Sequence, residues 1–104
     1  SEDVFGLVAV LHDVIEDTPV TIRDLKEEGF SSDVLDAVDC LTRRQDETYD
    51  AFIERCKANP IAIRVKIADL EDNMDIRQCD TLRAEDLERL NKYLKAWRSL
   101  TGEM

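Results

Sequence analysis

The run Val4-Phe5-Gly6-Leu7-Val8-Ala9-Val10-Leu11 contains no polar side chain, and it leads directly into His12-Asp13-Val14-Ile15. On a helix drawn over residues 3–15, with successive residues turned by about 100°, the apolar side chains of both stretches fall on every face. A helix that is apolar all round is typical of the centre of a domain. We therefore predict a helix here that the rest of the chain buries.

Five further helices are predicted from the spacing of apolar residues and from capping residues. Their expected ranges are residues 21–28, 31–41, 48–58, 60–76 and 84–100. Gly29 is expected to end the first of these, and Asn59-Pro60 to begin the fourth. The last helix is expected to form an outer wall, with one apolar stripe made of Leu87, Leu90, Leu94 and Trp97. Because no run alternates polar with apolar residues like a strand, residues 1–104 are predicted to form a single, compact, all-α domain of about six helices.

The composition disfavours several classes of function. The chain has 24 acidic and 14 basic residues, a formal net charge of −10, and an acidic surface repels nucleic acids and anionic membranes. Its longest apolar run is far shorter than the ~20 residues that cross a bilayer. Three widely separated cysteines indicate free thiols in a reducing cytoplasm. We expect a cytoplasmic protein that binds neither nucleic acid nor membrane, and the composition leaves its oligomeric state open.

Four titratable side chains crowd the end of the first helix. His12 and Glu16 share one helical face, and Asp13 and Asp17 share the neighbouring face. Three carboxylates and an imidazole this close repel or desolvate one another unless a cation is present. Their ligand types suit Mn²⁺, Fe²⁺ or Zn²⁺. The alternative is that His12 is a core histidine and the acids end in a solvated loop.

The predicted helix 60–76 carries a second polar group. Lys66, Asp69 and Asn73 fall within about 60° of one another on the helical wheel, between apolar residues on both sides, so that this stripe should run down the middle of the buried face. Charged groups are buried only when they are paired or bound to a metal. The stripe predicts a functional site; the alternative is an internal Lys66–Asp69 ion pair shielded by Asn73.

Taken together, these two segments resemble the (p)ppGpp hydrolases, which are metal-dependent phosphohydrolases of the HD type. Residues 11–18, Leu-His-Asp-Val-Ile-Glu-Asp-Thr, are similar to the His-Asp and Glu-Asp signature of these enzymes. Residues 65–69, Val-Lys-Ile-Ala-Asp, with Asn73-Met74 following, are similar to their downstream motif. Between the two, residues 38–44 resemble a stretch of the small stand-alone relatives.

The resemblance implies an HD-domain-like helical bundle that hydrolyses the 3′-pyrophosphate of (p)ppGpp or a related small-molecule nucleotide. It also implies a divalent metal, usually Mn²⁺, held by His12, Asp13 and Asp69. The remaining ligand in this family is an upstream histidine. Because His12 is the only histidine here, we expect that an N-terminal segment of the domain is missing and that this form binds metal weakly.

The same resemblance assigns roles to four other residues. Glu16 and Asp17 correspond to the acid pair associated with the attacking water and proton transfer. Lys66 and Asn73 correspond to residues near the nucleotide. A second interpretation stays open, namely that the chain keeps the HD fold only as a catalytically impaired binding or interaction module.

Overall fold

Six α-helices and one short 3₁₀ helix make up the computed structural model, which describes residues 2–102, with side chains from Val4 onward. In chain order the elements are α1 (Glu2–Asp17), α2 (Ile22–Glu27), α3 (Ser32–Cys40), α4 (Tyr49–Cys56), α5 (Pro60–Asn73), η1 (Ile76–Gln78) and α6 (Ala84–Thr101). No strand occurs in the described range. The predicted all-α bundle of six helices is thus confirmed, with boundaries close to those expected.

The helices begin where short polar side chains cap them. Thr21 makes a reciprocal capping box with Asp24, in which the Thr21 hydroxyl accepts from the Asp24 N–H at 3.1 Å. The Thr48 hydroxyl accepts from the Ala51 N–H ahead of α4, and Asn59 caps α5 with Pro60 in the first turn. Such caps pair backbone N–H groups that the helix cannot pair itself. These capping residues explain why the starts of the helices could be predicted from the sequence.

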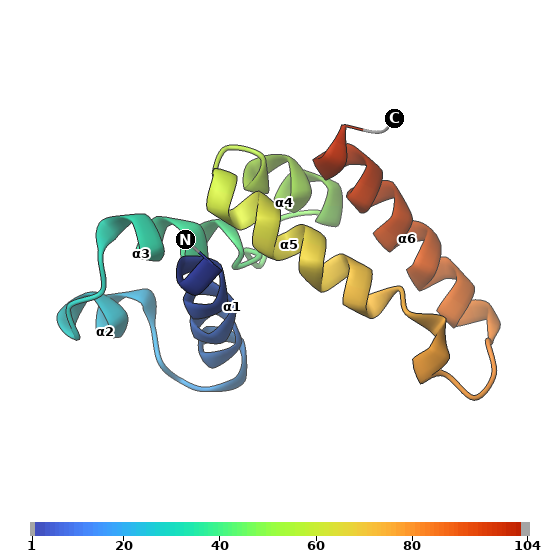
Figure 1. Ribbon diagram of the computed structural model, residues 1–104, viewed down its shortest axis with the longest axis horizontal. Helices are drawn as coiled ribbons and strands as arrows, with labels where there is room; N and C mark the ends of the chain where they lie inside the picture. The colour runs from blue at the N-terminus through green and yellow to red at the C-terminus, as the bar shows by residue number, and fades with distance from the viewer. Residues whose placement is uncertain (1, 103–104) are drawn as a thin grey trace.

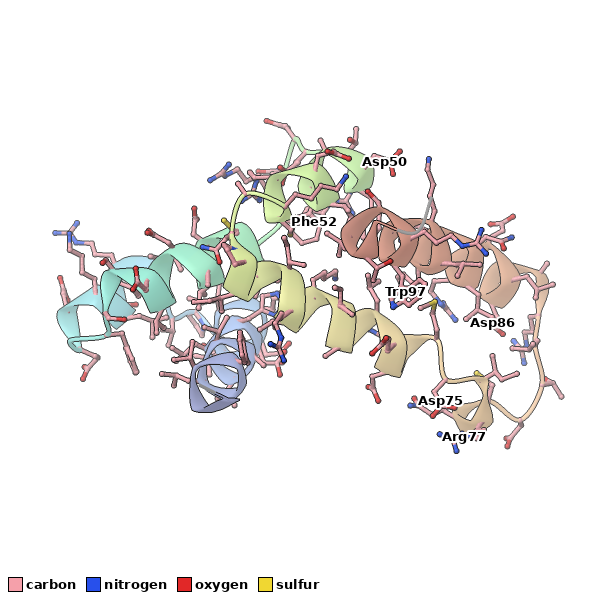
Figure 2. All side chains as sticks on the ribbon, turned by 45° about the horizontal axis from the view of Figure 1, so that its top comes forward. Asp50, Phe52, Asp75, Arg77, Asp86 and Trp97 are labelled. Atoms are coloured by element: carbon pink, nitrogen blue, oxygen red, sulfur yellow. The ribbon has the colours of Figure 1, made fainter. Side chains whose placement is uncertain are left out.

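Helix α5 is the central element of the fold. It packs against α1 and α3 on one side and against α4 and α6 on the other, while α2 packs on α3 (Figure 1). Phe52 of α4 and Trp97 of α6 lie between their own helices and α5 (Figure 2). The Trp97 Nε1–H also donates to Glu71 Oε2 on α5 at 3.0 Å. The core therefore follows α5 from Ala62 to Leu70, the first and last of its buried residues.

The prediction that α1 is buried on all sides is wrong. Val8 and Leu11 are buried, but Val10 is 59% exposed and Leu7 is 37% exposed. The reason is the position of α1 at an edge of the molecule, where α3 and α5 cover one side of it (Figure 1). Of the described helices, none is long and apolar enough to cross a membrane.

Helix α6 is an outer helix as expected, but the side it turns inward differs from the predicted stripe. Leu87 and Leu94 are exposed, whereas Ala96 and Leu100 are buried and Tyr93 packs against the core. The helix is rotated relative to the prediction because its contacts with α5 and α4 use these positions.

One ion pair holds the connection between α3 and α4. The Arg55 guanidinium donates to both carboxylate oxygens of Glu47, at 2.8 and 2.9 Å. It also donates to the carbonyl oxygens of Asp39 and Thr42. The hydrogen bonds from Arg55, together with one from the backbone N–H of Arg44, lower the pKa of Glu47 to about 2. This bidentate contact fixes residues 41–48 and hence the start of α4.

The ion pair predicts a specific pH dependence of stability. The pKa of the Glu47 carboxyl is ordinarily 4.5 and falls to about 2 in the fold, so its stabilising contribution is complete above about pH 4.5 and is lost as the pH falls toward 2. Glu47→Gln should therefore lower the free energy of unfolding at neutral pH, and its difference from the parent chain should narrow below about pH 4.5. Denaturant unfolding at several pH values measures this. The exposed Glu54, which pairs with Lys57, provides the control Glu54→Gln, and a Glu47→Gln effect that stays constant over the whole pH range would contradict the prediction.

Candidate functional site

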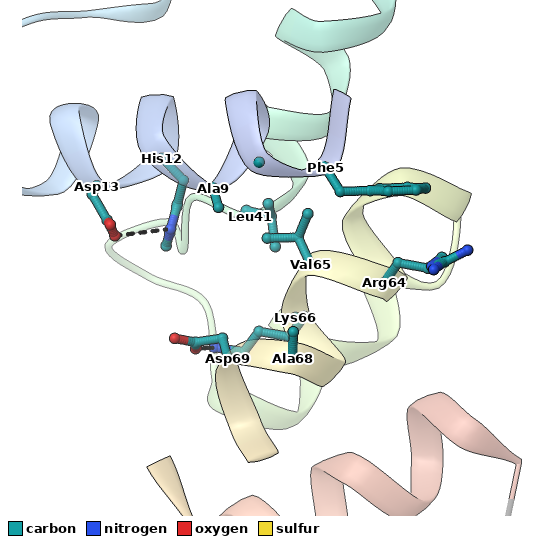
Figure 3. A pocket seen from close by; sticks show the side chains of 11 residues that line it. Phe5, Ala9, His12, Asp13, Leu41, Arg64, Val65, Lys66, Ala68 and Asp69 are labelled. Carbon is teal, nitrogen blue, oxygen red and sulfur yellow. Dashed lines mark hydrogen bonds and ion pairs between the residues drawn. The ribbon is translucent and has the colours of Figure 1, made fainter. Parts of the chain in front are cut away.

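A cavity of about 500 Å³ opens between α1 and α5 (Figure 3). It is lined by Phe5, Gly6, Ala9, His12 and Asp13 of α1, by Leu41 after α3, and by Arg64, Val65, Lys66, Ala68 and Asp69 of α5. Its apolar part lies toward the beginning of α1, where Phe5 and Val65 face each other. Its polar part lies where His12 and Asp13 face Lys66 and Asp69 (Figure 3).

The histidine lies in the polar part of the cavity with two carboxylates beside it. His12 Nε2 lies 3.0 Å from Glu16 Oε1, and His12 Nδ1 lies 3.8 Å from Asp13 Oδ1. Each of the three residues offers one ligand atom, and these atoms all lie within 4.8 Å of one another. One imidazole nitrogen and two carboxylate oxygens at this spacing form a donor set suited to a divalent transition metal.

The inner nitrogen of the histidine is buried without a hydrogen-bond partner. The His12 side chain is 14% exposed, and its Nε2 is shielded from solvent. The approach of Glu16 to this nitrogen does not have the geometry of a hydrogen bond. Buried polar atoms are paired in most proteins, and an exception calls for an explanation. A metal ion bound to the imidazole would supply the missing partner.

Lys66 and Asp69 occupy the facing wall of the cavity on α5. Lys66 Nζ lies 3.1 Å from Asp69 Oδ2, with the lysine side chain 12% exposed and the aspartate side chain 47% exposed. The ion pair that the sequence left as an alternative is therefore present. Asp69 opens onto the same cavity as His12 and Asp13, but it is not among the three residues whose ligand atoms cluster within 4.8 Å.

Three residues assigned to the site by sequence do not line the cavity. Glu16 is one of them, although its carboxylate lies 3.0 Å from His12 Nε2. Asp17, the last residue of α1, is exposed. Asn73 is also exposed, and it lines a separate small pocket with Tyr93 of α6. The prediction of a buried polar stripe on α5 is wrong beyond Lys66, because α5 extends past the end of its contact with α1 and its last turn is left in solvent (Figure 1).

Arg64 was not among the site residues predicted from the sequence, and its side chain is exposed. Its guanidinium lies over the ring of Phe5, with Cζ 4.4 Å from the ring centroid, and both residues line the cavity. A cation–π contact of this kind holds an arginine at the rim of a site. Nothing in the spacing of either segment pairs Phe5 with Arg64, so this contact could be found only in the structure.

No protein-family model matches the chain. The chain is similar to a guanosine-3′,5′-bis(diphosphate) 3′-pyrophosphohydrolase of Haemophilus influenzae, with 37% identity over 97 aligned residues. The alignment covers 83% of this chain and 14% of that enzyme. The chain thus spans about a seventh of the length of this curated relative.

The geometry of the cavity predicts how metal binding responds to substitution. His12→Ala should weaken Mn²⁺ binding by at least about tenfold, because even residues behind the metal ligands contribute that much. Asp69→Asn should weaken it as well if α5 contributes a ligand. Titration calorimetry with MnCl₂ measures both. Asp72→Asn, which changes an exposed carboxylate outside the cavity lining, is the control, and equal affinities in all three variants would rule out a metal site here.

Proposed function

We propose that this chain is a metal-dependent phosphohydrolase that hydrolyses the 3′-pyrophosphate of (p)ppGpp or a related nucleotide. The observation that carries the proposal is the buried, unpaired Nε2 of His12, a residue that lines the cavity of about 500 Å³ and lies beside Asp13 and Glu16. The similarity to a (p)ppGpp pyrophosphohydrolase supports the choice of substrate. The three free cysteines fit a cytoplasmic protein.

The residues present fit a bound divalent ion, for which Mn²⁺ is our proposal. His12, Asp13 and Asp69 would hold it, since they supply one nitrogen and two carboxylates from the two walls of one cavity. When bound, the ion supplies a Lewis acid for the phosphoryl oxygens and for the attacking water. In this chain Lys66 already lies beside Asp69, so its ammonium group can neutralise charge on the same phosphoryl oxygens.

The acid pair at the end of α1 handles the proton in this proposal. Glu16 Oε1 lies next to the imidazole of His12, and the side chain is half exposed, so its carboxylate can reach both the cavity and solvent. The water oxygen adds to the phosphorus that carries the 3′ oxygen, the bond from this phosphorus to the 3′ oxygen breaks, and the 3′ oxygen takes up a proton from solvent as pyrophosphate is released. Glu16 accepts the proton of the water. Asp17, the next residue in the chain, is exposed and transfers this proton to the solvent.

One observation favours the alternative of an impaired binding module. Asp17 and Asn73, two of the residues that the resemblance assigns to chemistry and nucleotide binding, do not line the cavity. A chain that kept the fold but not the reaction would bind Mn²⁺ or nucleotide and release no pyrophosphate. Activity and binding therefore have to be measured on the same protein.

The proposal is tested by pyrophosphate release from ppGpp in the presence of MnCl₂. Glu16→Gln and Asp17→Asn should each lower turnover by roughly 10²–10⁴, the range of general acid–base groups, with Mn²⁺ content largely unchanged. A chelator should abolish the activity of the parent chain, and Asp72→Asn should keep it. If Glu16→Gln loses metal and activity in equal measure, Glu16 is a ligand; if no nucleotide is hydrolysed although Mn²⁺ binds, the binding module is the better description.

A further inference from the structure

Three cationic side chains from three segments surround the ring of Tyr49, the first residue of α4. Lys92 Nζ of α6 lies 4.6 Å from the ring centroid, Arg43 Cζ of the α3–α4 connection lies 5.7 Å from it, and Lys66 Nζ of α5 lies 5.9 Å from it. Among the side chains that the structure describes, no carboxylate lies within 4.0 Å of Lys92 or Arg43. In a chain of net charge −10, Lys92 and Arg43 are thus two neighbouring cations without a paired carboxylate among residues 4–102, beside the Lys66–Asp69 ion pair.

The hydroxyl of the same tyrosine lacks a partner. Tyr49 Oη is buried and makes no hydrogen bond. Burial raises the pKa of Tyr49 to about 12, with smaller contributions from Tyr93 and Asp69. The hydroxyl therefore keeps its proton and is available as a donor. A buried donor without an acceptor is costly, and an anionic oxygen is the acceptor that three neighbouring cations would attract.

Lys66 connects this cluster to the cavity described above. Its ammonium group pairs with Asp69 on the cavity wall and lies 5.4 Å from the ring centroid of Phe52 and within cation–π range of Tyr49. A substrate that reaches the cavity at Lys66 would thus have a second set of cations on the far side of the same side chain.

We propose that Arg43, Tyr49 and Lys92 form a second anion subsite, which holds the phosphate group of the substrate that is remote from the bond being cleaved. The Tyr49 hydroxyl donates a hydrogen bond to a phosphate oxygen, and the two cations neutralise its charge. The subsite rests on the proposed function and deepens it, because it selects substrates with two separated anionic groups over substrates with one.

A purely structural role for the cluster makes a different prediction. Cation–π contacts alone would help hold α4 and α6 together, so that Lys92→Met would lower thermal stability and leave anion binding as it was. If the subsite exists, the affinity for anions should fall when the charge of Lys92 or the hydroxyl group of Tyr49 is removed. The two interpretations can therefore be separated by measuring stability and binding on the same variants.

The first experiment measures binding of inorganic pyrophosphate to the metal-free chain by titration calorimetry. Lys92→Met keeps the aliphatic stem and removes the charge, and Tyr49→Phe removes only the hydroxyl group. Each should weaken binding by about tenfold or slightly less, as expected for one charge-assisted hydrogen bond. Lys92→Arg should restore most of the affinity. Lys95→Met is the matched control, since Lys95 lies on the same helix and pairs with Asp50 at 3.4 Å.

The second experiment compares hydrolysis of ppGpp with hydrolysis of guanosine 3′-diphosphate, which lacks the 5′ phosphates. Lys92→Met should raise the KM for ppGpp, and the factor of this increase should be about ten times the factor for guanosine 3′-diphosphate. If Lys92→Met raises the KM for both nucleotides by the same factor, the subsite does not exist. The same conclusion follows if Lys92→Met binds pyrophosphate as tightly as Lys95→Met. If the parent chain hydrolyses neither nucleotide, the proposed function fails, and the calorimetric comparison still decides the subsite.

Discussion

The packing of α1 against α5 is the constraint on which the candidate site depends. His12 and Asp13 come from the first helix, and Lys66 and Asp69 come from the second. Val8 and Leu11 are buried on the side of α1 that faces the core. Because a helical side chain's direction is fixed by its position on the helix, this apolar contact also determines which polar residues face across the cavity. A rotation of α1 by one residue would turn His12 away from α5.

A second set of contacts extends this arrangement toward α6. The Arg55–Glu47 ion pair, 20% and 12% exposed at its two side chains, ties the start of α4 to the end of α3. Tyr49, the first residue of α4, lies with its ring centroid 5.9 Å from Lys66 Nζ of α5. The polar residues on α5 are thus reached by α1 through the cavity and by α4 and α6 through the tyrosine ring. The central position of α5 makes both contacts possible at once.

Much of this could be predicted from the sequence, and the failures have physical causes. Helix ends were readable because capping and glycine positions act locally, as at Thr21 and Asn59. The burial of α1 could not be predicted from the sequence. Periodicity shows which faces of a helix are apolar, but it does not show how many other helices are available to cover them. Rotation of α6 was missed for a related reason, since its stripe of leucines is wide enough to allow more than one orientation. The roles of His12, Asp13, Asp69, Glu16 and the other site residues stay predictions, although four of the seven line one cavity.

Unpaired buried side-chain atoms indicate where ligands are to be sought. Two buried side-chain atoms lack a hydrogen-bond partner within the described part of the chain, His12 Nε2 and Tyr49 Oη. The Lys66–Asp69 pair lies near both residues: it lines the cavity with His12, and Lys66 Nζ lies 5.9 Å from the ring centroid of Tyr49. Neither atom contributes to stability as it stands, since a buried polar group without a partner is unfavourable. One needs a Lewis acid and the other needs an acceptor. A phosphorylated substrate bound together with a divalent metal would satisfy both, which is why the two unpaired atoms support a single site rather than two unrelated defects of packing.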